Sequence, residues 1–140
     1  MPWPREVEVR SEIPTLTRVV TAEDVRAYAE AGGDRNPLHV DDDVARAAGF
    51  PGVIAHGVFT MGHLSACLAR WAGGPERIRR LEAQFRAPVF MGEEIVAGAR
   101  VKAVDVERAV ALLDCWVTLE RDGALEWPIK RGEAEVKLEP

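Results

Sequence analysis

The stretch VFTMGHLSACLARW, which runs from Val58 to Trp71, decides the fold of this chain of 140 residues. It is long enough for a helix of several turns, and its apolar residues fall on nearly every side of a helical wheel. A helix that is apolar all round is normally buried within its domain. The Gly-Gly-Pro sequence at 73–75 ends it. We therefore expect a central helix with the rest of the domain packed around it.

Four segments with strand character follow this helix: residues 78–89, 95–104, 109–120 and 127–138. In the second segment Ile95, Ala97 and Ala99 alternate with more polar residues, and the Arg-Asp-Gly sequence at 121–123 supplies a turn. An amphipathic antiparallel sheet beside a thoroughly apolar helix suggests that the sheet wraps the helix. This is the α+β hot-dog arrangement, although the pattern alone leaves other α+β folds open.

The first half of the chain is predicted to be helical. Thr21 and Asp24 have the spacing of an N-cap and its reciprocal carboxylate, and the Gly pair at 32–33 ends the helix that they start. Pro37 disfavours the α conformation at Asn36, so an irregular loop is expected there. No repeat or linker divides the chain, and its length suits one domain, residues 1–140.

Composition limits the class of protein. The formal net charge of -5 argues against a nucleic-acid partner, and no apolar run approaches the roughly 20 residues that cross a bilayer. The first ten residues, MPWPREVEVR, have neither the apolar core of a secretory signal nor the character of a transit peptide. Cys67 and Cys115 lie in apolar stretches, which favours buried thiols in a reducing compartment. We expect a cytoplasmic protein that binds neither membrane nor nucleic acid.

Asp34 and His39 are the first candidates for chemistry, because they flank a Pro-interrupted loop where side chains need not enter a core. A carboxylate and an imidazole that converge on one water could polarise it and move its proton, as water addition to an activated double bond requires. Alternatively, Asp34 only tightens the turn and His39 is a half-buried polar residue.

Gly57 is the second candidate, at the start of the predicted central helix. A backbone N–H there has no partner within the helix and lies at the positive end of the helix dipole, so it could stabilise an oxyanion. The absence of a side chain lets a ligand carbonyl approach the backbone. The other interpretation is that Gly57 only makes a tight turn into the helix.

These two clusters together resemble the MaoC-like (R)-specific enoyl-thioester hydratases and dehydratases. The signature of that family is Asp-X-Asn-Pro-X-His followed by an apolar pair and His-Gly. Here it reads DRNPLH at 34–39 and IAHG at 54–57. Further likeness lies in Gly-Phe at 49–50, Thr-Met-Gly at 60–62, FRAPV at 85–89 and Gly-Glu at 92–93. The resemblance runs from about Thr21 to the end of the chain and implies a single hot-dog domain.

The resemblance also implies roles for individual residues. Asp34 and His39 would hold the catalytic water, and the Gly57 N–H would donate to the thioester oxygen. On the substrate-binding side it implies a loop-fixing role for Asn36, a structural or pocket-lining role for His56 and an assisting role for Ser65. His63 would be a helix or interface residue, and Gln84 departs from the family, in which Asn is frequent at that position.

The implied activity is reversible hydration of trans-2-enoyl thioesters to (3R)-3-hydroxyacyl thioesters, carried by coenzyme A or acyl carrier protein, with no cofactor besides that carrier. The family implies a homodimer or a larger homo-oligomer. A closer likeness to the catalytic subunit of mycobacterial-type (3R)-hydroxyacyl-acyl-carrier-protein dehydratases implies, alternatively, a heterodimer with a related hot-dog subunit. The rival functions are a hot-dog thioesterase and a non-catalytic acyl-CoA-binding module.

Two further clusters have alternative interpretations. Asp34, His39, Asp41, His56 and His63 include the ligand types of zinc, but no pair has a compact metal-binding spacing on a predicted helix, so no metal is expected.

The second cluster, Arg77, Arg79 and Arg80, is either a solvated face or a contact for the phosphates of coenzyme A or for an acidic carrier protein.

Overall fold

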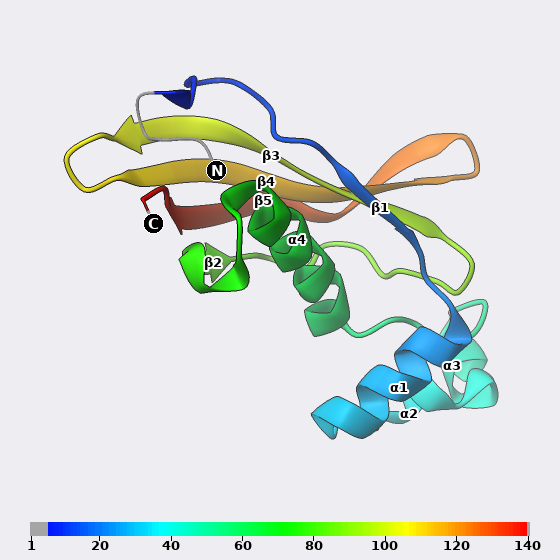
Figure 1. Ribbon diagram of the computed structural model, residues 1–140. Coiled ribbons are helices and arrows are strands. Elements are labelled where there is room, and N and C mark those ends of the chain that lie inside the picture. The colour runs from blue at the N-terminus through cyan, green and yellow to red at the C-terminus, as the bar shows by residue number, and fades with distance from the viewer. Residues whose placement is uncertain (1–5, 140) are drawn as a thin grey trace.

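One antiparallel sheet curls around a long helix in the computed structural model, which describes residues 6–139 (Figure 1). The elements in chain order are β1 Leu16–Val19, α1 Ala22–Gly32, α2 Pro37–Val40, α3 Asp42–Ala47, α4 Gly57–Ala72, the 3₁₀ turn η2 Pro75–Arg77, β2 Ile78–Glu82, β3 Glu94–Asp105, β4 Val110–Arg121 and β5 Ala124–Lys137. The five strands lie in the order β1-β3-β4-β5-β2, and every neighbouring pair is antiparallel. This is the predicted hot-dog fold.

The core lies between α4 and the concave face of the sheet. Alternate residues of β3, among them Ala97, Ala99 and Val101, are fully buried, as the period of two requires. Leu64 and Leu68 of α4 are also fully buried and belong to the same apolar cluster. The small side chains on β3 leave room for the larger leucines of the helix.

The prediction that α4 is buried on every side is wrong for one side of the helix. Val58, Gly62 and Ala66, spaced by four residues, are exposed, and Val58 keeps 57% of its surface in contact with solvent. The sheet covers α4 from one direction only, so it leaves this row, which we call the α4 stripe, uncovered within the chain.

The predicted strand at 78–89 is too long. β2 ends at Glu82, and residues 83–93, which we call the 83–93 loop, pair with the sheet backbone at one place, where Phe85 forms an isolated bridge with Ile129 and the Arg86 N–H donates to the Pro128 carbonyl at 2.9 Å. Pro88 has no N–H for a ladder, and Gly92 turns the chain with a φ of 84°.

Strand limits differ elsewhere as well. β5 begins at Ala124, earlier than predicted, because the Asp-Gly turn at 122–123 adopts positive φ angles of 53° and 77° and closes a tight hairpin. The short edge strand β1 was not predicted, since three of its four side chains are exposed and show no alternation.

The helices α1, α2 and α3 gather beyond the N-terminal end of α4, away from the sheet (Figure 1). Thr21 and Asp24 form the predicted capping box, and Gly33 ends α1 in the left-handed region with a φ of 74°. Asn36 is outside the α region, as expected, but Pro37 starts one helical turn instead of an irregular loop, because proline suits a first helical position. None of the helices in residues 6–139 is long and apolar enough to cross a membrane.

Candidate active site

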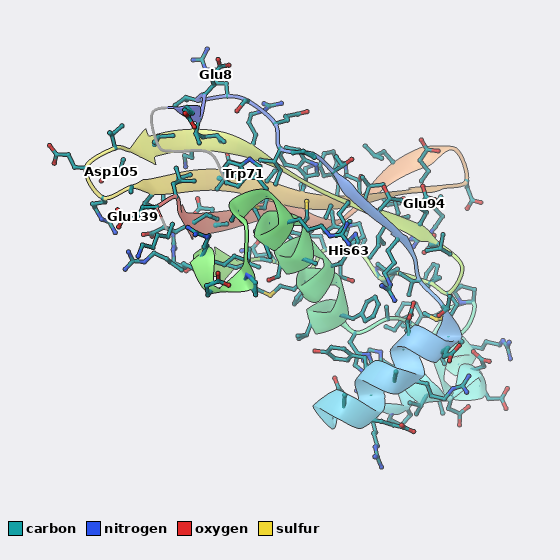
Figure 2. All side chains as sticks on the ribbon, in the orientation of Figure 1. Glu8, His63, Trp71, Glu94, Asp105 and Glu139 are labelled. Carbon is teal, nitrogen blue, oxygen red and sulfur yellow. The ribbon has the colours of Figure 1, made fainter. Side chains whose placement is uncertain are left out.

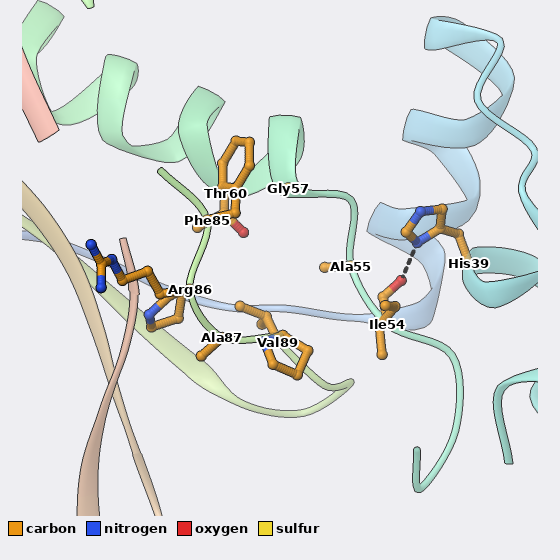
Figure 3. A pocket seen from close by; sticks show the side chains of 11 residues that line it. His39, Ile54, Ala55, Gly57, Thr60, Phe85, Arg86, Ala87 and Val89 are labelled. Atoms are coloured by element: carbon orange, nitrogen blue, oxygen red, sulfur yellow. Dashed lines mark hydrogen bonds between the residues drawn. The ribbon is translucent and has the colours of Figure 1, made fainter. Parts of the chain in front are cut away.

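A cleft of about 270 Å³ opens where the 83–93 loop passes the start of α4 (Figure 3). It is lined by His39, Ile54, Ala55, Gly57, Thr60, Phe85, Arg86, Ala87, Pro88, Val89 and Pro128. Most of these side chains are apolar, and the polar groups are few, as in sites for small molecules.

His39 enters the cleft from α2, whose last turn contains it. Its Nδ1 lies 2.7 Å from the carbonyl oxygen of Ile54, and because a carbonyl only accepts, Nδ1 carries the hydrogen (Figure 3). The Ile54 N–H in turn donates to the Leu38 carbonyl at 3.0 Å, so α2 is fastened to the segment before α4. In the neutral ring Nε2 is then the nitrogen that can exchange a proton with a ligand.

Asp34 lies beside His39, although the residue is exposed and is not part of the cleft wall. Its Oδ1 accepts the Asn36 N–H at 3.2 Å, which makes an Asx turn. The ligand atoms of Asp34, His39 and His56 all lie within 4.8 Å of one another. One water with two hydrogen bonds of about 2.8 Å each can span such a separation.

Gly57 is the first residue of α4 and lines the same cleft as His39. The N–H of Thr60 donates to the carbonyl of His56 at 3.3 Å, and no acceptor for the Gly57 N–H lies among residues 6–139. That N–H is therefore available to a ligand at the positive end of the helix. Phe85 packs directly over the position: a Cβ on Gly57 would lie 2.9 Å from its ring.

The three residues expected to bind substrate do not line the cleft. Asn36 is exposed, and its side-chain oxygen accepts the Leu38 N–H at 3.1 Å, which caps α2. Ser65 is half-buried further along α4. His56 is 1% exposed and lies behind His39.

His63 has a structural role. Its Nε2 lies 2.8 Å from the Leu16 carbonyl, which ties α4 to β1 (Figure 2). Burial lowers the pKa of this imidazole, because the charged form loses its hydration.

The cluster Arg77, Arg79 and Arg80 does not reach the cleft. Arg77 donates to the carbonyl of Glu139, and Arg80 forms ion pairs with Glu82 and Glu133. These contacts favour the interpretation of the cluster as a surface face.

Sequence reasoning missed two polar residues of the cleft. Thr60 lies three residues after Gly57, so one turn of helix places both on the same side. Arg86 sits in the 83–93 loop and donates to the side-chain oxygen of Gln84 at 3.0 Å. The helical spacing of Thr60 from Gly57 is a signal for its position, whereas the strand-like pattern around Arg86 gives none.

The ligand atoms of Asp34, His39 and His56 form a compact group, the kind of group that can hold a metal ion. The spacing of these residues in the sequence does not predict it. The rings of His39 and His56 are stacked, with centroids 3.9 Å apart and planes inclined by 24°. The nitrogen lone pairs lie in these nearly parallel planes and do not converge on one point, so the pair does not fit a shared ion.

The fold and the site define a class: a hot-dog protein in which a histidine and the N-terminus of the central helix line one cleft, with a carboxylate beside the histidine. A family model described as a MaoC like domain matches residues 5–113. The chain belongs to this family.

Individual relatives agree with this assignment. The chain is 34% identical over 124 residues to a 3-hydroxybutyryl-CoA dehydratase of Methylorubrum extorquens, covering 88% of this chain and 76% of the relative. It is 32% identical over 124 residues to the (R)-specific enoyl-CoA hydratase of Aeromonas caviae, covering 88% and 90%. The solved (R)-hydratase from A. caviae superposes with a TM-score of 0.83 and 30% identity over 96% of this chain and 99% of that chain.

Proposed function

We propose that this protein interconverts trans-2-enoyl and (3R)-3-hydroxyacyl thioesters by adding or removing water. Family membership and the hydratase and dehydratase relatives support this reaction class. The structural observation that supports the proposal is the cleft: His39 and Gly57 both line it, and Asp34 lies beside His39. An acid–base pair and an oxyanion donor are the two groups that the reaction needs.

In the hydration direction, Asp34 and His39 hold one water beside C3 of the enoyl group. The pair takes a proton from this water as its oxygen bonds to C3, and the C2–C3 π electrons move toward the thioester carbonyl. The Gly57 N–H and the N-terminal end of α4 stabilise the resulting enolate oxygen. The pair then returns a proton to C2, so that one water is added and no redox step occurs.

The assembly is proposed from the family and from the α4 stripe. An uncovered apolar row on a central helix suits a second hot-dog subunit, either an identical copy or a related non-catalytic chain, as the likeness to mycobacterial-type dehydratases implies.

Both cysteines are free, buried thiols, which supports a cytoplasmic location. Burial raises the pKa of Cys115 to about 12, so this thiol stays protonated.

The test is a spectrophotometric assay of the enoyl-thioester absorbance with crotonyl-CoA and longer enoyl-CoAs, followed by chiral analysis of the product. We expect loss of the absorbance and a pure (3R) product, because a rigid site presents water to one face of the planar enoyl group. Release of free thiol instead of hydration would identify a thioesterase. Binding without either reaction would identify a non-catalytic module. A racemic product would contradict the fixed geometry, and a pure (3S) product would contradict the family assignment.

A further inference from the structure

Behind the cleft, the ring of His56 contacts the rings of two other residues. It is stacked on His39 of α2, at a centroid distance of 3.9 Å, and it packs against Tyr28 of α1 at 4.8 Å with the two planes tilted by 48°. His56 itself is the N-cap residue of α4. With 1% of its surface exposed, it is shielded from solvent by its neighbours.

His56 also contacts the other member of the acid–base pair. Its Nε2 lies 2.9 Å from the backbone carbonyl of Asp34, and since the carbonyl only accepts, Nε2 carries the hydrogen. One side chain therefore fixes the backbone position of Asp34 through a hydrogen bond and the ring plane of His39 through stacking.

The remaining nitrogen of His56 argues against a role in packing alone. Nδ1 is buried and has no hydrogen-bond partner among residues 6–139. A buried polar atom without a partner lowers stability, and a phenylalanine would fill a similar volume without that penalty. The imidazole combines a flat ring with a donor that reaches the Asp34 carbonyl, and an aliphatic or phenyl side chain cannot supply both.

We propose that His56 is a positioning residue that sets the separation and orientation of Asp34 and His39. It does not touch the substrate, and it acts through the two residues that do. The inference rests on the proposed function, because those two residues are the acid–base pair of that reaction. A displacement of about 1 Å in such a pair can lower turnover by roughly a hundredfold.

Two variants separate the contacts. His56→Phe keeps a ring in the stack and removes the donor to Asp34, while His56→Gln keeps an amide donor and removes the ring. We expect each to lower kcat by roughly tenfold or more with KM changed by less than about threefold, because the substrate contacts remain while the pair is misplaced. The pH profile of kcat/KM should also shift in His56→Gln, since His39 loses its stacked neighbour.

His63 provides the matched control. It is the other buried histidine of α4, and its Nε2 also lies within hydrogen-bond distance of a backbone carbonyl, that of Leu16. His63→Phe and His63→Gln should lose stability on thermal unfolding but keep kcat and the pH profile within about twofold of wild type. If the His56 variants behave as the His63 variants do, His56 is only structural and the proposal is wrong.

A second readout separates this inference from the proposed function. The ¹⁵N shifts of the His39 ring report its tautomer and its titration without any substrate. A change of either in His56→Gln or His56→Phe, but in neither His63 variant, supports positioning even if the wild-type protein hydrates no enoyl thioester. An unchanged His39 ring in both His56 variants would overturn the proposal whatever the activity.

Discussion

Asp34 and His39 reach the same place from a loop and a single helical turn, and each is held by backbone contacts. The Asn36 N–H binds the Asp34 carboxylate, while the Ile54 carbonyl accepts from the His39 ring. If the pair moves the proton of the attacking water, Asp34→Asn and His39→Ala should each lower kcat by at least about a hundredfold. The measurement is steady-state hydration of each enoyl thioester that the parent accepts.

Asp43→Asn is the control for that comparison. Asp43 is a nearby carboxylate on α3, but its side chain is 95% exposed and pairs only loosely with Arg46, at 3.5 Å. We expect unchanged turnover from this variant. Near-normal rates in both Asp34→Asn and His39→Ala would show that the chemistry lies elsewhere.

Gly57 provides a second prediction at the residue scale, because Phe85 leaves no space for a side chain there. In Gly57→Ala the new Cβ would press on the Phe85 ring at 2.9 Å, which should lower the free energy of unfolding by about 1–3 kcal/mol. Turnover should also fall, since the methyl group occupies the approach of the thioester carbonyl.

Chemical denaturation and the hydration assay measure the two effects of that substitution. The double variant Gly57→Ala with Phe85→Ala separates them: the contact with the ring is removed, so stability should recover. Turnover should stay low. Recovery of both would mean that Gly57 serves only to accommodate Phe85.

The sequence pattern predicts where the candidate site residues lie, but it does not predict the tertiary contacts behind them. Loop and helix-start positions make Asp34, His39 and Gly57 candidates, because side chains and N–H groups are exposed there, and the resemblance to the MaoC-like family gives them their expected roles. The stack of His56 on His39 could not, since it joins residues 17 positions apart through tertiary packing.

At the scale of elements, the 83–93 loop forms one wall of the cleft and is held by a side chain of β4. Arg121 binds both carboxylate oxygens of Glu93, at 2.6 and 2.8 Å, and donates to the Pro88 carbonyl at 2.9 Å. Its guanidinium also lies 4.1 Å from the centre of the Phe90 ring. A loop with little regular hydrogen bonding is thus fixed to the sheet at three points.

Arg121→Met should free this loop. The Glu93 side chain is only 15% exposed, so removal of its partner should cost about 2 kcal/mol of folding stability. KM should rise by up to roughly tenfold, the equivalent of 1.4 kcal/mol of binding, with a smaller change in kcat. Thermal unfolding and steady-state kinetics measure these effects.

Arg100→Met is the matched control for the loop prediction. Arg100 and Glu12 also form an ion pair, at 2.9 Å, but both side chains are more than half exposed. Such pairs contribute at most about 1 kcal/mol. Equal losses in the Arg100 and Arg121 variants would contradict a special role for the contact with the loop.

The elements themselves differ in how well a pattern predicts them. The long strands β3 and β4 follow their alternation closely, because each has one face in the core. β1 and the end of β2 depend on pairing with distant segments at the sheet edges, which leaves little local signal. The 83–93 loop has strand-like residues but interrupts the ladder at Pro88 and Gly92.

At the scale of the whole molecule, the α4 stripe remains unexplained by the contacts within one chain. A central helix with exposed valine and alanine at regular spacing loses apolar burial unless another surface covers it. The sequence predicted burial on all sides of α4, and the single chain provides it on all but this one. The apolar pattern of α4 and its exposure in the single chain agree if a second hot-dog subunit covers the α4 stripe.

Ala66→Glu tests this assembly, because a carboxylate in the middle of an apolar contact is costly to bury. The substitution places the acid four residues before Arg70, an arrangement that supports the helix itself, so the fold should persist. By light scattering over a range of concentrations, we expect wild-type protein at twice the 15.4 kDa chain mass and the variant at the chain mass. Ala27→Glu, at an exposed alanine of α1, should stay dimeric.

A wild-type protein that stays monomeric at every concentration would exclude the homodimer. If a copurified hot-dog chain then restores the larger mass, the heterodimer is favoured instead.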